Sequence, residues 1–141
     1  MSEAQLSPPS QALISENAAI LERFRRDGVD IECKLEFDFI VEFASKSQAE
    51  DFRAAIRKLI PSVKSAYGLN ECVFMLCRYE DEGLFELRTC VEMSADARVI
   101  SGLEAVLNSV APKFGGSECC WEFPDPANKD VVTHSGRRAV Q

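Results

Sequence analysis

The chain has 141 residues, of which 46% are hydrophobic and 28% are charged, as is usual for one globular domain. Its 16 Lys and Arg against 23 Asp and Glu give a formal charge of −7, which disfavours nucleic-acid backbones and favours a basic protein partner. No stretch approaches the about 18 apolar residues of a membrane span, and no export signal is present, so we expect a cytoplasmic protein. Acidity of this size can equally serve solubility alone.

The first half of the chain predicts two helices around a long strand. Residues 1–9 are expected to form a flexible leader, and Ser10 can cap a helix that ends at Asp27-Gly28. Apolar and mainly acidic residues alternate over Ile31–Phe43, which predicts a strand with one buried face and one acidic face. A capping box then begins at Ser47, and Pro61 is expected to end that helix.

The second half predicts a hairpin, a helix and a short strand. Strand-forming residues at Cys72–Tyr79 and an alternating run at Leu84–Met93 favour a hairpin. A helix capped by Ser94 follows, and residues 119–123 alternate again. Residues 124–141 are polar and without periodicity, so we expect a flexible tail.

The order of these elements predicts an α+β fold. A leading helix followed by β-α-β-β-α-β is the pattern of a ferredoxin-like sandwich, in residues 10–123. Right-handed crossovers would place two helices on one face of a four-stranded antiparallel sheet, with the first and third strands central. The leading helix would lie against an edge, cover part of the open face, or form a dimer contact.

The open face of this sheet is expected to be acidic. Its outward positions hold eight carboxylates among twelve residues and no aromatic ring: Glu32, Lys34, Glu36, Asp38, Glu42, Glu86, Arg88, Cys90, Glu92, Glu118, Cys120 and Glu122. Stacking of single-stranded RNA on such a face is disfavoured. Two interpretations remain: an ordinary solvated face, or a dock for an Arg- and Lys-rich protein segment.

The sequence offers no constellation for catalysis, a cofactor or a metal. It contains no glycine-rich phosphate loop, nucleophile elbow or Cys/His pairing. Cys119 and Cys120 are adjacent, so on a strand they point to opposite faces, and the single His134 lies in the polar C-terminal segment. We therefore expect reduced thiols, no metal and no catalytic residue.

Four segments together resemble one family. They are the helix end Phe24–Asp30, the capped helix after the long strand, Thr89–Met93 before the next helix, and residues 113–116 leading into 120–126. This pattern, over roughly residues 12–126, is similar to the regulator of ribonuclease activity B family, small acidic bacterial proteins that bind and inhibit ribonuclease E.

The resemblance implies a ferredoxin-like, non-enzymatic protein without a cofactor, which docks on the regulatory, RNA-binding part of ribonuclease E and slows RNA decay. With the acidic strand face, it points to a dock formed by Glu32, Glu36, Asp38, Glu42, Glu86 and Glu92. The partner would be ribonuclease E or another basic RNA-binding protein, with no direct contact to nucleic acid and none to a membrane.

Two departures from the family pattern stand out. The family commonly has Gly before the late Trp, where this chain has Cys120 before Trp121. Better-known members carry a strongly acidic C-terminal tail, whereas residues 124–141 hold two acidic residues against three basic ones. Two other functions stay open: a small-ligand-binding or dimerising ferredoxin-like domain, and an enzyme of unassigned type. The sequence leaves the oligomeric state open.

Overall fold

A computed structural model describes residues 6–79 and 83–135. The elements in these residues are α1 (Gln11–Arg26), β1 (Leu35–Phe43), α2 (Lys46–Arg57), α3 (Ile60–Tyr67), β2 (Val73–Tyr79), β3 (Leu84–Met93), α4 (Ala97–Val110), the 3-10 helix η1 (Ala111–Phe114), β4 (Cys120–Asp125) and β5 (Asn128–His134). The predicted α+β class is therefore confirmed.

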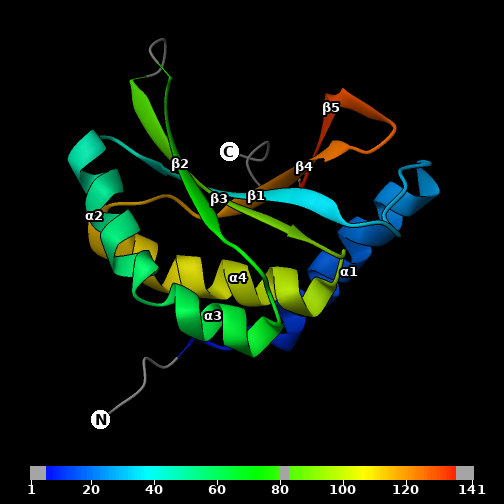
Figure 1. Cartoon of the computed structure of the whole chain (residues 1–141), viewed down its shortest axis with the longest axis horizontal. Helices are drawn as coiled ribbons and strands as arrows, with labels where there is room; N and C mark the ends of the chain where they lie inside the picture. The colour runs from blue at the N-terminus through cyan, green and yellow to red at the C-terminus, as the bar shows by residue number, and fades with distance from the viewer. Residues whose placement is uncertain (1–5, 80–82, 136–141) are drawn as a thin grey trace.

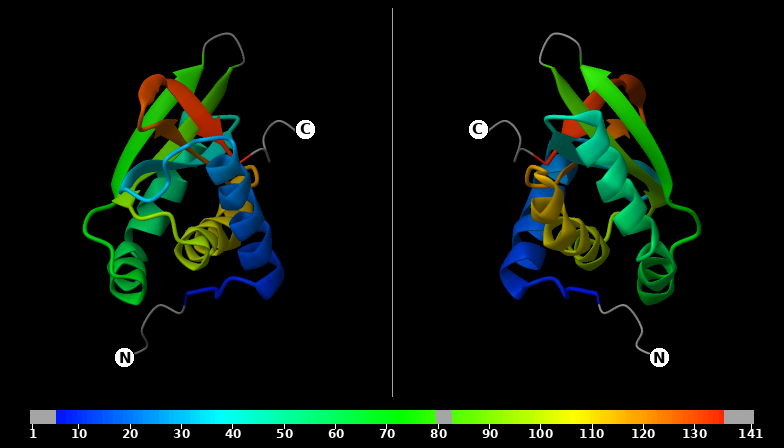
Figure 2. Two further views of the ribbon diagram at one scale, coloured as in Figure 1. Left: turned by 90° about the vertical axis from the view of Figure 1, so that its right-hand side faces the viewer. Right: turned by 90° about the vertical axis from the view of Figure 1, so that its left-hand side faces the viewer.

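The strands form one antiparallel sheet in the order β2-β3-β1-β4-β5. The helices cover one face of it, as Figures 1 and 2 show, and we call the opposite face the outer face. The predicted four-stranded sheet is thus corrected to five strands, because β5 pairs with β4 and makes β4 an interior strand. β1 and β3 are neighbours inside the sheet, as predicted.

The inner face of the sheet is built from the apolar half of each alternating strand. In β1, Phe37 and Phe39 are fully buried, and in β4 so are Trp121 and Phe123. Phe24 of α1 lies edge-on to Trp121 and Phe123, with ring centroids 6.2 and 5.6 Å away. α1 therefore packs under β4, an interior strand next to β5, on the same face as the other helices, and the outer face stays open.

Three predicted boundaries are corrected by local side-chain hydrogen bonds. β1 begins at Leu35, not Ile31, because Asp30 Oδ1 accepts from Glu32 N at 3.0 Å and bends the chain. The N-cap of α2 is Ser45, two residues before the predicted Ser47. The N-cap of α4 is Asp96 instead of Ser94, since its carboxylate accepts from the backbone N of residues 98 and 99.

Pro61 does not end the helical region. It lies in the first turn of α3, where a helix needs no backbone N–H donor and proline is tolerated. α3 ends at Gly68, whose φ of +64° is the left-handed conformation that favours glycine. The residues that directly follow Pro61, which were expected to lie beyond the end of the helix, are therefore helical.

The predicted flexible tail is wrong for residues 124–135. β4 continues to Asp125, and β5 returns beside it, fixed by Ser135 N donating to Trp121 O at 2.9 Å. The Thr133 hydroxyl adds a bond to Phe123 O at 2.8 Å. Backbone pairing with β4, not an apolar pattern, orders this segment. The rest of the predicted tail, residues 136–141, and residues 1–5 of the predicted leader lie outside the described residues.

Candidate functional site

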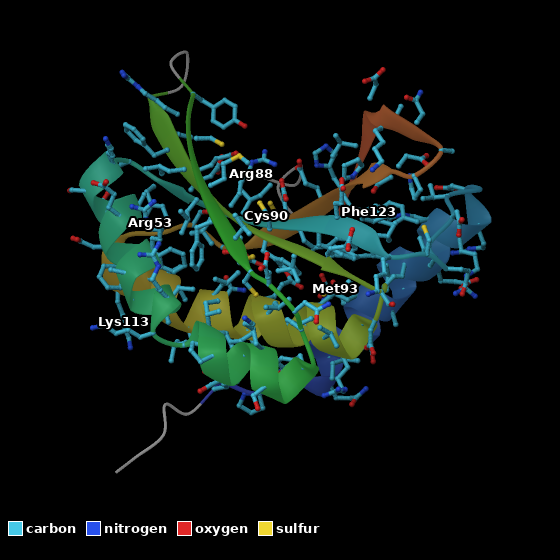
Figure 3. All side chains as sticks on the ribbon, in the orientation of Figure 1. Arg53, Arg88, Cys90, Met93, Lys113 and Phe123 are labelled. Atoms are coloured by element: carbon cyan, nitrogen blue, oxygen red, sulfur yellow. The ribbon has the colours of Figure 1, made fainter. Side chains whose placement is uncertain are left out.

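The centre of the outer face holds one arginine among three carboxylates. Arg88 of β3 donates from Nη1 to Asp38 of β1 at 2.8 Å and to Glu122 of β4 at 3.0 Å, and from Nε to Glu86 at 3.1 Å. Its Nη2 also donates to the Tyr79 hydroxyl at 3.3 Å. We call Arg88, Asp38, Glu86 and Glu122 the Arg88 cluster; Figure 3 shows Arg88 on the side of the sheet away from the helices.

The Arg88 cluster is largely withdrawn from water. The exposed fraction is 15% for the Arg88 side chain and 0% for that of Glu86. Burial acts to lower the pKa of Arg88, but the hydrogen bonds to Asp38, Tyr79 and Glu122 outweigh it and the pKa is raised. Arg88 is therefore a permanent cation that holds three strands together and neutralises part of the acidic face.

The structure places the six carboxylates predicted as a dock in different surroundings. Asp38 and Glu86 belong to the Arg88 cluster, and Glu42 is half-buried, with its backbone N donating to Ser117 Oγ at 2.8 Å. Glu36 and Glu92 are exposed on the outer face, directly opposite each other in β1 and β3.

Glu32 does not lie on the sheet. It precedes β1 in the loop after α1, where its carboxylate pairs with Arg25 at 3.2 Å. Its side chain is 77% exposed. The structure therefore corrects the prediction that Glu32 faces outward on the long strand with Glu36.

An acidic groove of 570 Å³ lies on the outer face, where β1 and β3 meet the segment that enters β2. Its lining residues are Glu36, Phe37, Asp38, Asn70, Glu71, Val73, Cys90, Val91 and Glu92. Glu36 also meets Lys129 at 3.5 Å, whereas no ion pair joins Glu71 or Glu92 to another described residue. The groove thus presents exposed negative charge to solvent.

Sequence reasoning missed the outward side chains of β2. The register with β3 places Val73, Met75, Cys77 and Tyr79 on the outer face, next to the groove and the Arg88 cluster. Val73 is 54% exposed and Met75 51% exposed. Cys72–Tyr79 is apolar on both faces in the sequence. A strand with that pattern is typical of a buried position, so the sequence did not indicate that these side chains are exposed. Tyr79 also corrects the expectation of no aromatic residue on this face.

The Cys90 thiol on the outer face is disfavoured as a nucleophile. Burial raises the pKa of Cys90 to about 12, with further contributions from a hydrogen bond to Asp38 and its charge. All six cysteines are free. Within residues 6–79 and 83–135, no group of three or more His, Cys, Asp or Glu side chains is placed to hold a metal ion.

Comparison with known proteins identifies the family. No helix in the described part of the chain is both long and apolar enough to cross a membrane. No curated protein and no solved structure matches the chain. A family model described as Regulator of ribonuclease activity B matches residues 14–122, which run from α1 into β4 and include the acidic groove. The chain therefore belongs to the Regulator of ribonuclease activity B family.

Proposed function

We propose that this protein is a non-enzymatic regulator that binds ribonuclease E, or a similarly basic RNA-binding protein, through the acidic groove. The observation that carries this proposal is the division of the outer face. Arg88 neutralises the central carboxylates, whereas Glu36, Glu71 and Glu92 stay exposed beside the apolar side chains of β2. Membership of a family of ribonuclease regulators supports a protein partner.

The electrostatics of the groove favour a cationic side chain. Glu36 and Glu92 are directly opposite across β1 and β3, and like charges in that position repel. A Lys or Arg from the partner would relieve this repulsion, and the field of an acidic surface would speed the encounter with a basic protein. An arginine could also bridge two carboxylates with its planar fork.

The two groups of carboxylates have different roles in this proposal. The Arg88 cluster links the outward side chains of β1, β3 and β4 by hydrogen bonds. Glu36 and Glu92 then project from this rigid support toward the partner. Of the six residues predicted from sequence, these two are the contacts, Asp38 and Glu86 hold the surface, and the half-buried Glu42 and the loop residue Glu32 are left out.

The alternative of a small apolar ligand receives less support. Such a ligand calls for a pocket lined mainly by apolar and aromatic side chains, expected here between sheet and helices. The acidic groove instead lies on the outer face, with Glu36, Asp38, Glu71 and Glu92 in its lining. These carboxylates suit a basic group better than a hydrophobic molecule.

A matched pair of charge reversals tests the proposal. We expect Glu36→Lys with Glu92→Lys to weaken binding to ribonuclease E by about tenfold or more at low salt, where screening is weakest. The control is Glu50→Lys with Asp51→Lys, which makes the same charge change at exposed positions of α2, on the helix side.

The comparison between the two double variants separates docking from net charge. Equal losses in both would mean that only the overall acidity matters, and the groove would be abandoned as the docking site. Wild-type affinity of the Glu36→Lys, Glu92→Lys protein at low salt would do the same. In either case circular dichroism must first establish that both variants are folded.

A further inference from the structure

β2 is an edge strand whose free side is unprotected. It pairs only with β3 among the described strands, over an unbroken register. Its seven residues include no proline and one charged residue, Arg78. Proteins usually guard such edges with charges, proline or a β-bulge, because an unpaired strand edge can bind another chain.

The opposite edge of the sheet has those guards. The pairing of β4 with β5 is shifted by an irregularity between Pro124 and Asp125. β5 itself carries Lys129, Asp130 and His134 within seven residues. The two edges of one sheet therefore differ: β5 carries charged side chains and pairs irregularly with β4, whereas β2 has an unbroken register and a single charge.

The outward side chains of β2 are large and mainly apolar, yet they are exposed to solvent. Val73, Met75 and Tyr79 are 54%, 51% and 40% exposed, and they follow one another along the outer face. Glu71 of the acidic groove lies two residues before the start of β2. The unpaired backbone edge of β2 is thus flanked by a row of exposed side chains and, at its N-terminal end, by the acidic groove.

We propose that β2 receives an extended segment of the protein partner as an additional strand of the sheet. This proposal rests on the proposed function and names the mode of binding at the same surface. Backbone hydrogen bonds to the free edge would supply affinity, and alternate side chains would supply specificity, as in other complexes formed by strand addition. The segment would run past Val73 and Met75 toward Glu71.

The charges on the two sides of β2 define the pattern of that segment. On the outer side lie the exposed carboxylates of the acidic groove. On the inner side the guanidinium of Arg57 lies 5.8 Å from the ring of Phe74, and that of Arg78 lies 5.8 Å from the ring of Phe85. The added strand would therefore alternate Lys, Arg or apolar residues facing outward with acidic or apolar residues facing inward.

The same charges argue against a second copy of this chain as the occupant. Two β2 strands paired edge to edge would bring the acidic grooves of two copies onto one face. They would also bring Arg57 and Arg78 of both copies onto the other face. With a formal charge of −7 on each chain, self-association at this edge is opposed on both faces.

The test combines hydrogen exchange with a neutral substitution pair. We expect ribonuclease E to slow the amide exchange of residues 73–79 in the full chain by about tenfold or more. We expect Val73→Ser with Met75→Ser to weaken binding about tenfold. The control is Val131→Ser with Val132→Ser, since these residues of β5 are similarly exposed, at 49% and 41%. None of these changes alters a charge, so the groove electrostatics are untouched.

The outcomes separate this proposal from the proposed function. Strand addition would be overturned if ribonuclease E binds without slowing amide exchange at residues 73–79 and binds the Val73→Ser, Met75→Ser variant with wild-type affinity. The proposed function would still stand in that case. Strand addition by the partner would also be overturned if the chain alone forms a concentration-dependent dimer that the same variant abolishes. The β2 edge would then be assigned to a second copy of the chain.

If ribonuclease E does not bind at all, the proposed function fails for ribonuclease E as the partner, and a synthetic peptide then tests whether the β2 edge accepts an added strand. The probe is a peptide that matches the seven residues of β2 in length and alternates Arg with Val. Capture of this peptide, lost when its alternate amides are N-methylated, would support strand addition. No capture, or equal capture of the methylated form, would overturn it.

Discussion

Removal of the central cation should destabilise the protein strongly. In the Arg88→Met variant the side chain keeps its approximate length, but Asp38, Glu86 and Glu122 lose the guanidinium that contacts them at 2.8 to 3.1 Å. Glu86 is fully buried, so water cannot replace the lost partner. Breaking a buried ion pair by removing one partner costs about 3–5 kcal/mol.

This loss would be a large fraction of the total stability, which for most domains is about 5–15 kcal/mol. For a chain of 141 residues it corresponds to a decrease in Tm of about 6–20 °C. Urea denaturation measures the free energy of unfolding directly. Adding Glu86→Gln to Arg88→Met should recover about 1–2 kcal/mol, because the buried negative charge is then removed.

The control for this prediction is Arg25→Met. Arg25 also contacts two carboxylates, Glu22 at 3.8 Å and Glu32 at 3.2 Å, but its side chain is 57% exposed. Exposed ion pairs contribute about 0–1 kcal/mol, so this variant should stay near wild-type stability. If Arg88→Met costs less than about 1 kcal/mol, or no more than Arg25→Met, the claim that the Arg88 cluster holds the sheet together is refuted.

Two further predictions concern buried groups. Asn17 is fully buried, accepts a hydrogen bond from Trp121 Nε1 at 3.1 Å and donates to Ser101 and Glu104. Asn17→Leu should therefore lower the free energy of unfolding by about 2–3 kcal/mol in urea titrations. A cost below about 0.5 kcal/mol would contradict this prediction. The raised pKa of Cys90 means that the folded protein keeps this thiol proton up to about pH 12, whereas an unfolded thiol loses it near pH 9. Cys90 should therefore favour the folded state fully below pH 9 and lose that contribution as the pH rises toward 12. Alkylation at pH 8, followed by mass spectrometry, should modify exposed Cys33 well before the partly buried Cys90. Equal alkylation rates would contradict the raised pKa of Cys90.

Alternation in the sequence was enough to predict the acidic outer face, but not which of its carboxylates are exposed. Glu36 and Asp38 occupy equivalent positions in the pattern of β1. Only the folded sheet brings Arg88 to Asp38, 50 positions away in the chain, and to Glu122, 34 positions away. One side chain from a neighbouring strand therefore decides whether a carboxylate holds the fold together or faces a partner.

The strand order could not be predicted in full for a related reason. Residues 128–134 have no apolar alternation, and they become a strand because the backbone edge of β4 is available to them. β2 shows the reverse case, since its apolar residues predict burial and the sheet order leaves it at an edge. In both segments, tertiary pairing decides what local sequence cannot.

The most direct test of the account is the binding of the purified wild-type chain to ribonuclease E, with RNA cleavage followed in parallel. It should be measured at about 0.01 M and about 0.15 M salt, where the Debye length is about 30 Å and about 8 Å. The account predicts a complex that weakens as salt rises and slower cleavage of RNA while the complex persists. No complex at either salt concentration, or a complex that leaves the cleavage rate unchanged, would contradict the proposal that this acidic protein regulates ribonuclease E by docking on it.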